Sequence, residues 1–179
     1  MAETYTLHVA GLTRELPICK VNEHMDIAAF IMFSDVELTV ACARELLKKC
    51  PEFDVILTAE AKGIPLAYEM SRQSGKQWIP ARKGAKLYMR EPVVIEDESI
   101  TTAGKQTLVI DQDDIDYMNG KRILIVDDVI STGGSLHALE TLAAKSTGTV
   151  VSRCAALAEG DAANRTDITF LAPLPLFLH

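Results

Sequence analysis

Short apolar segments alternate along the chain with segments whose apolar positions recur at helical spacing. Five apolar segments are predicted as strands: residues 53–58, 76–81, 122–126, 149–157 and 169–171. Three segments are predicted as helices: residues 34–47, 63–73 and 135–145. Nearly continuous apolar strands are typical of a parallel sheet that is buried on both faces. The alternation therefore predicts an α/β fold in which a parallel sheet is flanked by helices and joined by right-handed connections.

Polar residues predict several element boundaries. Ser34 and Glu37 have the S-x-x-E spacing of a capping box, which predicts that a helix begins there. The runs "PVVIEDESI" and "KQTLVID" predict a β-hairpin whose turn lies near residues 102–104. The acidic run at residues 111–116 is predicted to be a solvent-exposed turn, because its spacing does not fit an EF-hand calcium loop.

Three polar loops follow predicted strands, at residues 59–65, 81–86 and 127–135. In an open parallel sheet, ligands bind beyond the carboxyl ends of the strands, where such loops meet. Together these loops offer one acidic pair and several cations. The sequence therefore predicts one binding site at this edge of the sheet.

The third loop carries the most specific chemical signal. Its hydroxyl and glycine residues, from Ser131 to Ser135, open a predicted helix, and backbone N–H groups at a helix N-terminus form a cradle for phosphate. Neither the Walker A spacing nor the G-x-G-x-x-G fingerprint is present. Asp127 and Asp128 stand directly before the cradle, where carboxylates suit hydroxyl donors rather than phosphate. This combination predicts a site for a ribose that carries a 5-phosphate.

Composition narrows the class of protein. The chain has 179 residues, 48% of them hydrophobic, and no apolar run near the ~20 residues that a membrane span needs. A formal net charge of -7 argues against a nucleic-acid partner held by phosphate contacts. The four cysteines form no CxxC pair, and the first residues lack the basic segment followed by an apolar one that is typical of a signal peptide, so we expect none. We therefore expect reduced thiols, a cytoplasmic location and no membrane partner.

Several stretches resemble one known family. "ILIVDDVISTGGS" closely resembles the phosphoribosyl-pyrophosphate motif of type I phosphoribosyltransferases. "TAEAKGIPLAYEM" is similar to the pyrophosphate loop of that family, and "ARKGAKLY" to the arginine-lysine segment that leads into its mobile catalytic loop. "LAEGDAANR" followed by "LAPLPLF" resembles the end of adenine-type members. The resemblance covers most of the chain from about Phe53 onward.

The resemblance implies an organisation and a reaction. It implies one domain over residues 1–179, with a small hood at about residues 1–33 and a mobile hairpin lid at about residues 84–111. The reaction would transfer the phosphoribosyl group of phosphoribosyl pyrophosphate to a purine base. Mg²⁺ would be the cofactor, carried by the substrate near Asp127 and Asp128 rather than bound directly by the protein. A homodimer is also implied, in which the arginine-lysine segment can reach across the interface.

The resemblance further implies a role for each matching position. Asp127 and Asp128 would be catalytic and would hold the ribose hydroxyls. The ribose 5-phosphate would lie against one continuous segment: Asp127, Asp128, Val129, Ile130, Ser131, Thr132, Gly133, Gly134 and Ser135. Pyrophosphate would be held by two loops: Ala61, Lys62, Gly63, Arg82, Lys83 and Lys86. The first of these loops would bind partly through its backbone and across a non-proline cis peptide.

The identity of the base rests on weaker signals. The candidate base-binding residues are Met25, Asp26 and Glu159. Residues 16–30 depart from the proline-glycine hood of adenine-type members, and "KVNEHMDI" is closer to xanthine-type members, whereas the lid and the late segment resemble the adenine type. We predict adenine, with xanthine or guanine as the alternative. A non-catalytic regulator that senses phosphoribosyl pyrophosphate is the second hypothesis.

Overall fold

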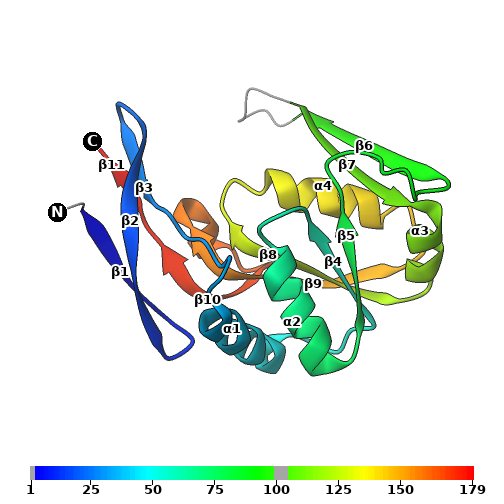
Figure 1. Ribbon diagram of the computed structural model, residues 1–179, viewed down its shortest axis with the longest axis horizontal. Helices are drawn as coiled ribbons and strands as arrows, with labels where there is room; N and C mark the ends of the chain where they lie inside the picture. The colour runs from blue at the N-terminus through cyan, green and yellow to red at the C-terminus, as the bar shows by residue number, and fades with distance from the viewer. Residues whose placement is uncertain (1–2, 99–104) are drawn as a thin grey trace.

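A parallel sheet forms the centre of the computed structural model, which describes residues 3–98 and 105–179 (Figure 1). Within those residues the sheet has five strands in the order β10-β9-β8-β4-β5, and every neighbouring pair is parallel. Its strands are β4 (Val55–Ala59), β5 (Gln77–Ala81), β8 (Arg122–Ile130), β9 (Thr149–Glu159) and β10 (Thr169–Leu174). The predicted α/β fold with a parallel sheet is confirmed.

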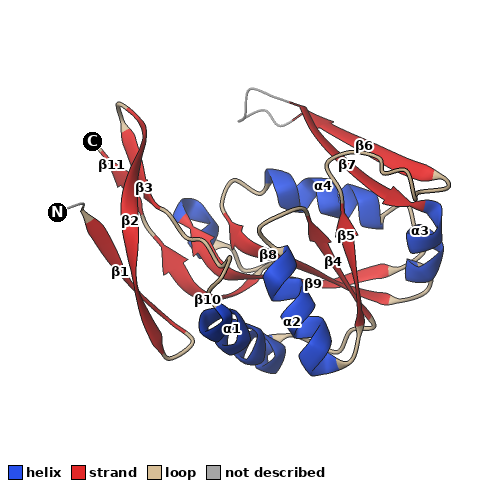
Figure 2. Ribbon diagram, in the orientation of Figure 1, coloured by secondary structure: helices blue, strands red, loops and turns tan. Residues whose placement is uncertain are grey.

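Helices cover both faces of this sheet, as Figure 2 shows. The helices are α1 (Val36–Lys49), α2 (Ile64–Ser74), α3 (Gln112–Met118), α4 (Gly134–Ala143) and the short 3-10 helix η1 (Gly160–Asn164). Leu124 and Val126 of β8 pack into the apolar cluster that contains α1 and α2, whereas Ile123 and Ile125 pack into the cluster that contains α3 and α4. Side chains of a strand alternate between its faces, so this apolar run is buried on both sides.

A second, antiparallel sheet lies at one end of the molecule and consists of strands alone (Figure 2). Its strands are β1 (Thr4–Val9), β2 (Leu12–Asn22), β3 (Met25–Ala28) and β11 (Leu176–Leu178). The sequence did not predict that β11, from the other end of the chain, completes this sheet by pairing with β3. None of the helices in the described residues is long and apolar enough to cross a membrane.

The predicted hairpin is confirmed as β6 (Pro92–Glu98) paired with β7 (Lys105–Asp111). Its predicted turn at residues 102–104 lies outside the described residues. A backbone bridge between Arg82 and Val109 ties β7 to the loop that follows β5. The hairpin therefore stands beside the carboxyl ends of the central strands.

The predicted capping box at Ser34 is wrong. Asp35 is the N-cap of α1, and its Oδ1 accepts a hydrogen bond from the backbone N–H of Leu38 at 3.1 Å. Ser34 has a φ of 69°, and Glu37 pairs with Arg14 of β2, so neither residue makes the reciprocal contacts of a capping box. The start of α1 therefore depends on Arg14 of the distant strand β2, which pairs with both Asp35 and Glu37.

The acidic run at residues 111–116 is not a turn but the beginning of α3. The Asp111 carboxylate accepts the N–H of Gln112, and acidic residues in the first turn favour the positive end of the helix dipole. Ile115 and Met118 are buried on the inner side of this helix. The helix forms because its apolar residues reach the core.

Candidate functional site

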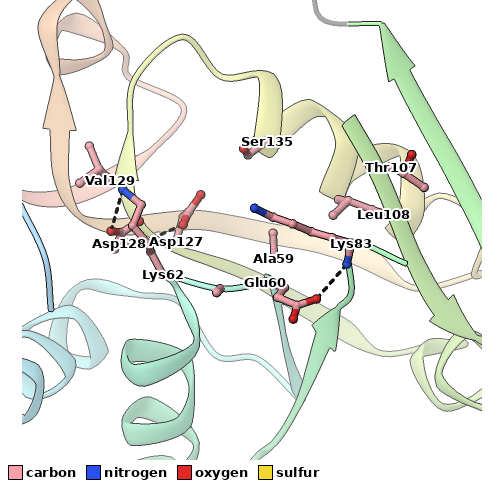
Figure 3. Close-up of a pocket in the computed structure, with 11 residues that line it drawn as sticks. Ala59, Glu60, Lys62, Lys83, Thr107, Leu108, Asp127, Asp128, Val129 and Ser135 are labelled. Atoms are coloured by element: carbon pink, nitrogen blue, oxygen red, sulfur yellow. Dashed lines mark hydrogen bonds and ion pairs between the residues drawn. The ribbon is translucent and has the colours of Figure 1, made fainter. Parts of the chain in front are cut away.

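Loops at the carboxyl ends of β4, β5 and β8 surround a cavity of about 710 Å³ (Figure 3). Side chains from the loop after β4, the loop after β5, the hairpin strand β7, the end of β8 and the first residues of α4 line it. This is the edge of the sheet at which the sequence predicted a site. The position follows from the parallel topology, which brings three distant loops together.

The acidic pair lies at the floor of this cavity. The backbone N–H of Asp128 donates to Oδ1 of Asp127 at 2.9 Å. Asp128 is only 2% exposed, and its Oδ2 is buried without a hydrogen-bond partner among the described residues. The nearest cation is Lys62, whose Nζ lies 3.6 Å from that oxygen. The site thus holds a buried acceptor that a ligand can satisfy.

Burial and the neighbouring carboxylate raise the pKa of Asp127 to about 8. Burial makes the larger contribution, because it disfavours the charged form, and the charge of Asp128 adds repulsion. The Lys62 ammonium offsets only part of this. Without a ligand, the pair is therefore short of positive charge and of hydrogen-bond donors.

The loop after β4 approaches the acidic pair closely. Its Glu60–Ala61 peptide bond is cis, as the resemblance implied. A Cβ at Gly63 would lie 2.5 Å from Oγ1 of Thr58 and 3.1 Å from Oδ1 of Asp127, so only glycine fits here. Lys62 of this loop is exposed, and its Nζ lies 3.6 Å from Oδ2 of Asp128.

The loop from Ser131 to Ser135 forms a smaller hollow of about 70 Å³ that continues from the acidic pair. Gly133 is the N-cap of α4 and has a φ of 87°, a left-handed conformation that glycine adopts without a steric penalty. The backbone N–H groups of this turn and the dipole of α4 favour an anion. The left-handed Gly133 at the start of α4 is compatible with the predicted phosphate cradle.

The three candidate cations after β5, Arg82, Lys83 and Lys86, lie in different environments. Lys83 extends across the cavity toward Asp127 and Ser135 (Figure 3). Arg82 instead pairs with Glu60, with 3.1 Å between Nε and Oε2, and donates to the hydroxyl of Tyr88. Lys86 is not among the described residues that line the cavity, and its positive charge contributes to the lowered pKa of Glu60. Of these three cations, only Lys83 reaches the cavity in this conformation.

The candidate base residues do not gather in one place. Glu159, at the end of β9, is partly buried and faces the Ser131 hydroxyl, and burial raises its pKa. Met25 and Asp26 lie on β3 of the antiparallel sheet, and Oδ2 of Asp26 is 3.0 Å from Nε2 of His179. Neither residue is among the described residues that line the cavity.

Sequence reasoning missed several residues of the site. Thr107 and Leu108 line the cavity from β7, and nothing in their local pattern indicates this. Glu60 accepts the backbone N–H of Lys83 at 2.9 Å as well as the Arg82 guanidinium, so it joins the two cation-bearing loops. A carboxylate directly before the "AKG" loop was the available signal for Glu60.

Comparison with known proteins agrees with this geometry. The family model described as the phosphoribosyl transferase domain matches residues 37–168, which is more than half of the chain. The chain belongs to this family. The match begins within α1 and runs through the acidic pair and the loop at the start of α4.

Individual relatives support the family assignment. An adenine phosphoribosyltransferase of Thermotoga sp. (strain RQ2) is 39% identical over 101 residues, and that alignment spans 56% of this chain and 56% of the relative. One from Mycobacterium avium (strain 104) is 29% identical over 170 residues, which are 94% of this chain and 89% of the relative. The chain thus spans little more than half the length of the first relative.

Solved structures match the phosphoribosyltransferase fold. The crystal structure of an adenine phosphoribosyltransferase from Thermoanaerobacter pseudethanolicus has a TM-score of 0.68 at 26% identity and covers 79% of this chain and 84% of its own. A Saccharomyces cerevisiae enzyme with adenine bound has a TM-score of 0.61 at 21% identity, covers 76% of this chain and 77% of its own, and supports the fold alone.

Proposed function

We propose that this protein transfers the 5-phosphoribosyl group of phosphoribosyl pyrophosphate to adenine, with release of pyrophosphate. The observation that carries the proposal is the place of the acidic pair. Asp127 and Asp128 lie between the cis-peptide loop after β4 and the phosphate cradle that opens α4. The substrate has its groups in the matching order: the ribose hydroxyls lie in the middle, and the 5-phosphate and the pyrophosphate lie on either side.

Each loop has a role in this proposal. Asp127 and Asp128 accept hydrogen bonds from the ribose hydroxyls, which supply the donors that these carboxylates lack. The cradle of residues 131–135 binds the 5-phosphate through backbone N–H groups and hydroxyls. The Ala61-Lys62-Gly63 loop and Lys83 hold pyrophosphate. Arg82 and Lys86 join them when Arg82 leaves Glu60.

The charges suit the bond that breaks. As the bond from C1 to pyrophosphate lengthens, positive charge develops on the ribose ring and negative charge on the leaving group. The carboxylates below the ring stabilise the first, and the lysines around the pyrophosphate stabilise the second. A charge-assisted hydrogen bond contributes about 1.5–3 kcal/mol, so several acting together give a large effect on rate.

Magnesium fits the donor set. Carboxylate oxygens are ligands that Mg²⁺ prefers, and the buried Oδ2 of Asp128 is an acceptor without a hydrogen-bond partner among the described residues. Bound with phosphoribosyl pyrophosphate, Mg²⁺ would offset the negative charge of the leaving group. The described residues include no group of three or more His, Cys, Asp or Glu side chains that could hold a metal ion. We propose that Mg²⁺ is carried by phosphoribosyl pyrophosphate and lies near Asp127 and Asp128.

The remaining parts of the proposal concern the setting of the site. The antiparallel sheet, of which β1, β2 and β3 lie within residues 1–33 and which β11 completes, would form the hood. The hairpin within residues 84–111 would close over the cavity and exclude water. Glu159 would approach the base. The whole chain would act as one domain in a cytoplasmic homodimer. The names of the relatives support adenine as the base.

Pyrophosphate release tests the proposal directly. Purified protein with Mg²⁺ and phosphoribosyl pyrophosphate is offered adenine, hypoxanthine, guanine, xanthine, uracil or orotate in separate reactions. Release with adenine alone is the expected result. Release with xanthine or guanine alone would replace adenine by that base. Tight Mg²⁺-dependent binding without release for any base would overturn the enzyme in favour of a sensor of phosphoribosyl pyrophosphate.

A further inference from the structure

Arg165 lies against the phosphate cradle, although none of the roles proposed above uses it. Its backbone N–H donates to the carbonyl of Ala162 at 3.1 Å at the end of η1. A Cβ at Gly133 would lie 3.0 Å from Nη1 of Arg165. The guanidinium therefore occupies the space into which a side chain at position 133 would project.

Asp167 fixes the orientation of this guanidinium. Nε of Arg165 donates to Oδ1 of Asp167 at 2.9 Å, and Nη2 donates to Oδ2 at 2.7 Å. Two parallel hydrogen bonds use one edge of the planar group and leave Nη1 on the opposite side. Nη1 faces Gly133. The hydrogen bonds from Arg165 lower the pKa of Asp167 to about 2, so the pair stays ionised at neutral pH.

Charged residues of α4 and β9 lie around this pair. Glu140 of α4 faces Arg165, and it also forms an ion pair with Arg153 of β9. The positive charge of Arg153 in turn contributes to the lowered pKa of Asp167. Cations and anions alternate in this cluster, and Arg165 is the member that touches the cradle.

We propose that Arg165 is a positioning residue for the 5-phosphate: anchored by Asp167, it supports the cradle at Gly133 and places positive charge behind it. The inference rests on the proposed function of the same cradle. A phosphate monoester carries close to two negative charges at neutral pH, so a fixed guanidinium a few ångströms behind the loop strengthens its binding. A supported loop also keeps its N–H groups oriented before the ligand arrives.

Separate titrations of the two halves of the substrate test this inference. Ribose 5-phosphate and magnesium pyrophosphate are each titrated into the wild type and into Arg165→Gln. We expect the dissociation constant of ribose 5-phosphate to rise about tenfold, equivalent to about 1.4 kcal/mol, and that of pyrophosphate to change less than twofold. In turnover, KM for phosphoribosyl pyrophosphate rises by a similar factor and kcat stays within about threefold.

Two further variants sharpen the result. Arg122→Gln removes another two-point Arg–Asp contact, from the opposite end of β8, and is expected to leave both dissociation constants unchanged. Arg165→Lys keeps the charge and is expected to recover at least half of the lost binding free energy. No recovery at all would overturn the electrostatic part of the proposal.

The outcomes separate this inference from the function on which it rests. Unchanged binding of ribose 5-phosphate by Arg165→Gln overturns the role of Arg165 and leaves the proposed enzyme intact. Equal weakening of both ligands indicates a general loosening of the site and also overturns the inference. A wild-type protein that binds neither ligand and releases no pyrophosphate would instead overturn the proposed function itself.

Discussion

The charged residues at the two ends of β8 lie in opposite environments: opposite charges are paired at its start, and like charges are adjacent at its carboxyl end. At its start, the Arg122 guanidinium makes two hydrogen bonds with Asp54, of 3.0 and 2.9 Å, and a third with Glu52 of 2.8 Å. These contacts hold the pKa of Asp54 well below its usual range. At the other end, Asp127 and Asp128 lie side by side, Nζ of the exposed Lys62 is 3.6 Å from Oδ2 of Asp128, and the pKa of Asp127 rises to about 8.

This contrast separates a structural role from a functional one. The start of β8 carries opposite charges in contact, which need no ligand. At its carboxyl end two carboxylates are adjacent, and Oδ2 of Asp128 is buried without a hydrogen-bond partner among the described residues. Locally unfavourable arrangements of this kind are typical of functional sites, where a bound ligand supplies the missing interactions. The predictions below test that difference.

The largest expected effect comes from neutralising the functional end. Asp127→Asn combined with Asp128→Asn removes both carboxylate charges and replaces one acceptor oxygen of each side chain by an NH2 donor, while keeping side-chain volume. Two lost charge-assisted contacts of about 1.5–3 kcal/mol each correspond to a loss of about 10²–10⁴ in kcat/KM. Steady-state pyrophosphate release measures this, and circular dichroism verifies folding. A folded double variant with normal turnover would contradict the assignment of the pair.

A smaller but still large effect is expected at Gly63. Gly63→Ala places a Cβ 2.5 Å from Oγ1 of Thr58 and 3.1 Å from Oδ1 of Asp127, so the loop after β4, which we propose binds pyrophosphate, must shift away from the acidic pair. Because a displacement of about 1 Å can cost about a hundredfold in rate, we expect kcat/KM to fall by one to two orders of magnitude.

Thr58→Ala provides the matched control for Gly63. The Thr58 hydroxyl is buried without a hydrogen-bond partner among the described residues, so its removal alone should change activity little. In the double variant Gly63→Ala, Thr58→Ala, the closest contact of the new Cβ disappears, and activity should partly return. A double variant no better than Gly63→Ala would show that the clash with Thr58 is not the cause.

The pH dependence of stability should also distinguish the two ends. Because the pKa of Asp127 is raised from 3.8 to about 8, the unfolded chain loses this proton first as pH rises. Between about pH 4 and pH 8 the native state therefore binds more protons, and its stability falls with rising pH, by an amount on the order of a few kcal/mol. The lowered pKa of Asp54 has the opposite sign and acts only in more acidic solution.

Denaturant titrations of the ligand-free protein at several pH values measure this slope. Asp127→Asn should flatten most of it, and the variant should unfold at higher denaturant than the wild type near pH 8. Glu159, whose pKa burial also raises, leaves a small residual slope of the same sign. A wild type whose stability does not fall between pH 4 and pH 8 would contradict the charge imbalance at this end.

The same contrast explains what the sequence could predict. Asp127, Asp128 and the cradle are consecutive, so their chemistry is visible in one stretch, and the parallel topology fixes the edge to which it belongs. The Asp54–Arg122 pair joins the residue before β4 to the first residue of β8, and no local pattern indicates it. Contacts between residues far apart in sequence depend on packing, which a periodicity does not contain.

The errors of sequence reasoning have this same origin. Arg14 of β2 draws Asp35 and Glu37 into ion pairs, which moves the start of α1 away from the predicted capping box. The acidic run after Asp111 becomes helical because Ile115 and Met118 find a core that its composition does not reveal. Likewise, Arg165 at the end of η1 lies beside Gly133, a residue far from it in the sequence, and no local pattern indicates this.

The smallest effect on activity is expected at the structural end of β8. Arg122→Gln removes the ion pairs with Asp54 and Glu52, which are partly exposed, so a modest fall in Tm is expected. Activity should stay within twofold of the wild type, because the lost contacts lie at the opposite end of the strand from the cavity. Thermal unfolding and pyrophosphate release, measured on the same preparation, check both parts. A strong loss of activity with little change in Tm would mean that the two ends are coupled through β8, and the division between a structural and a functional end would then be wrong.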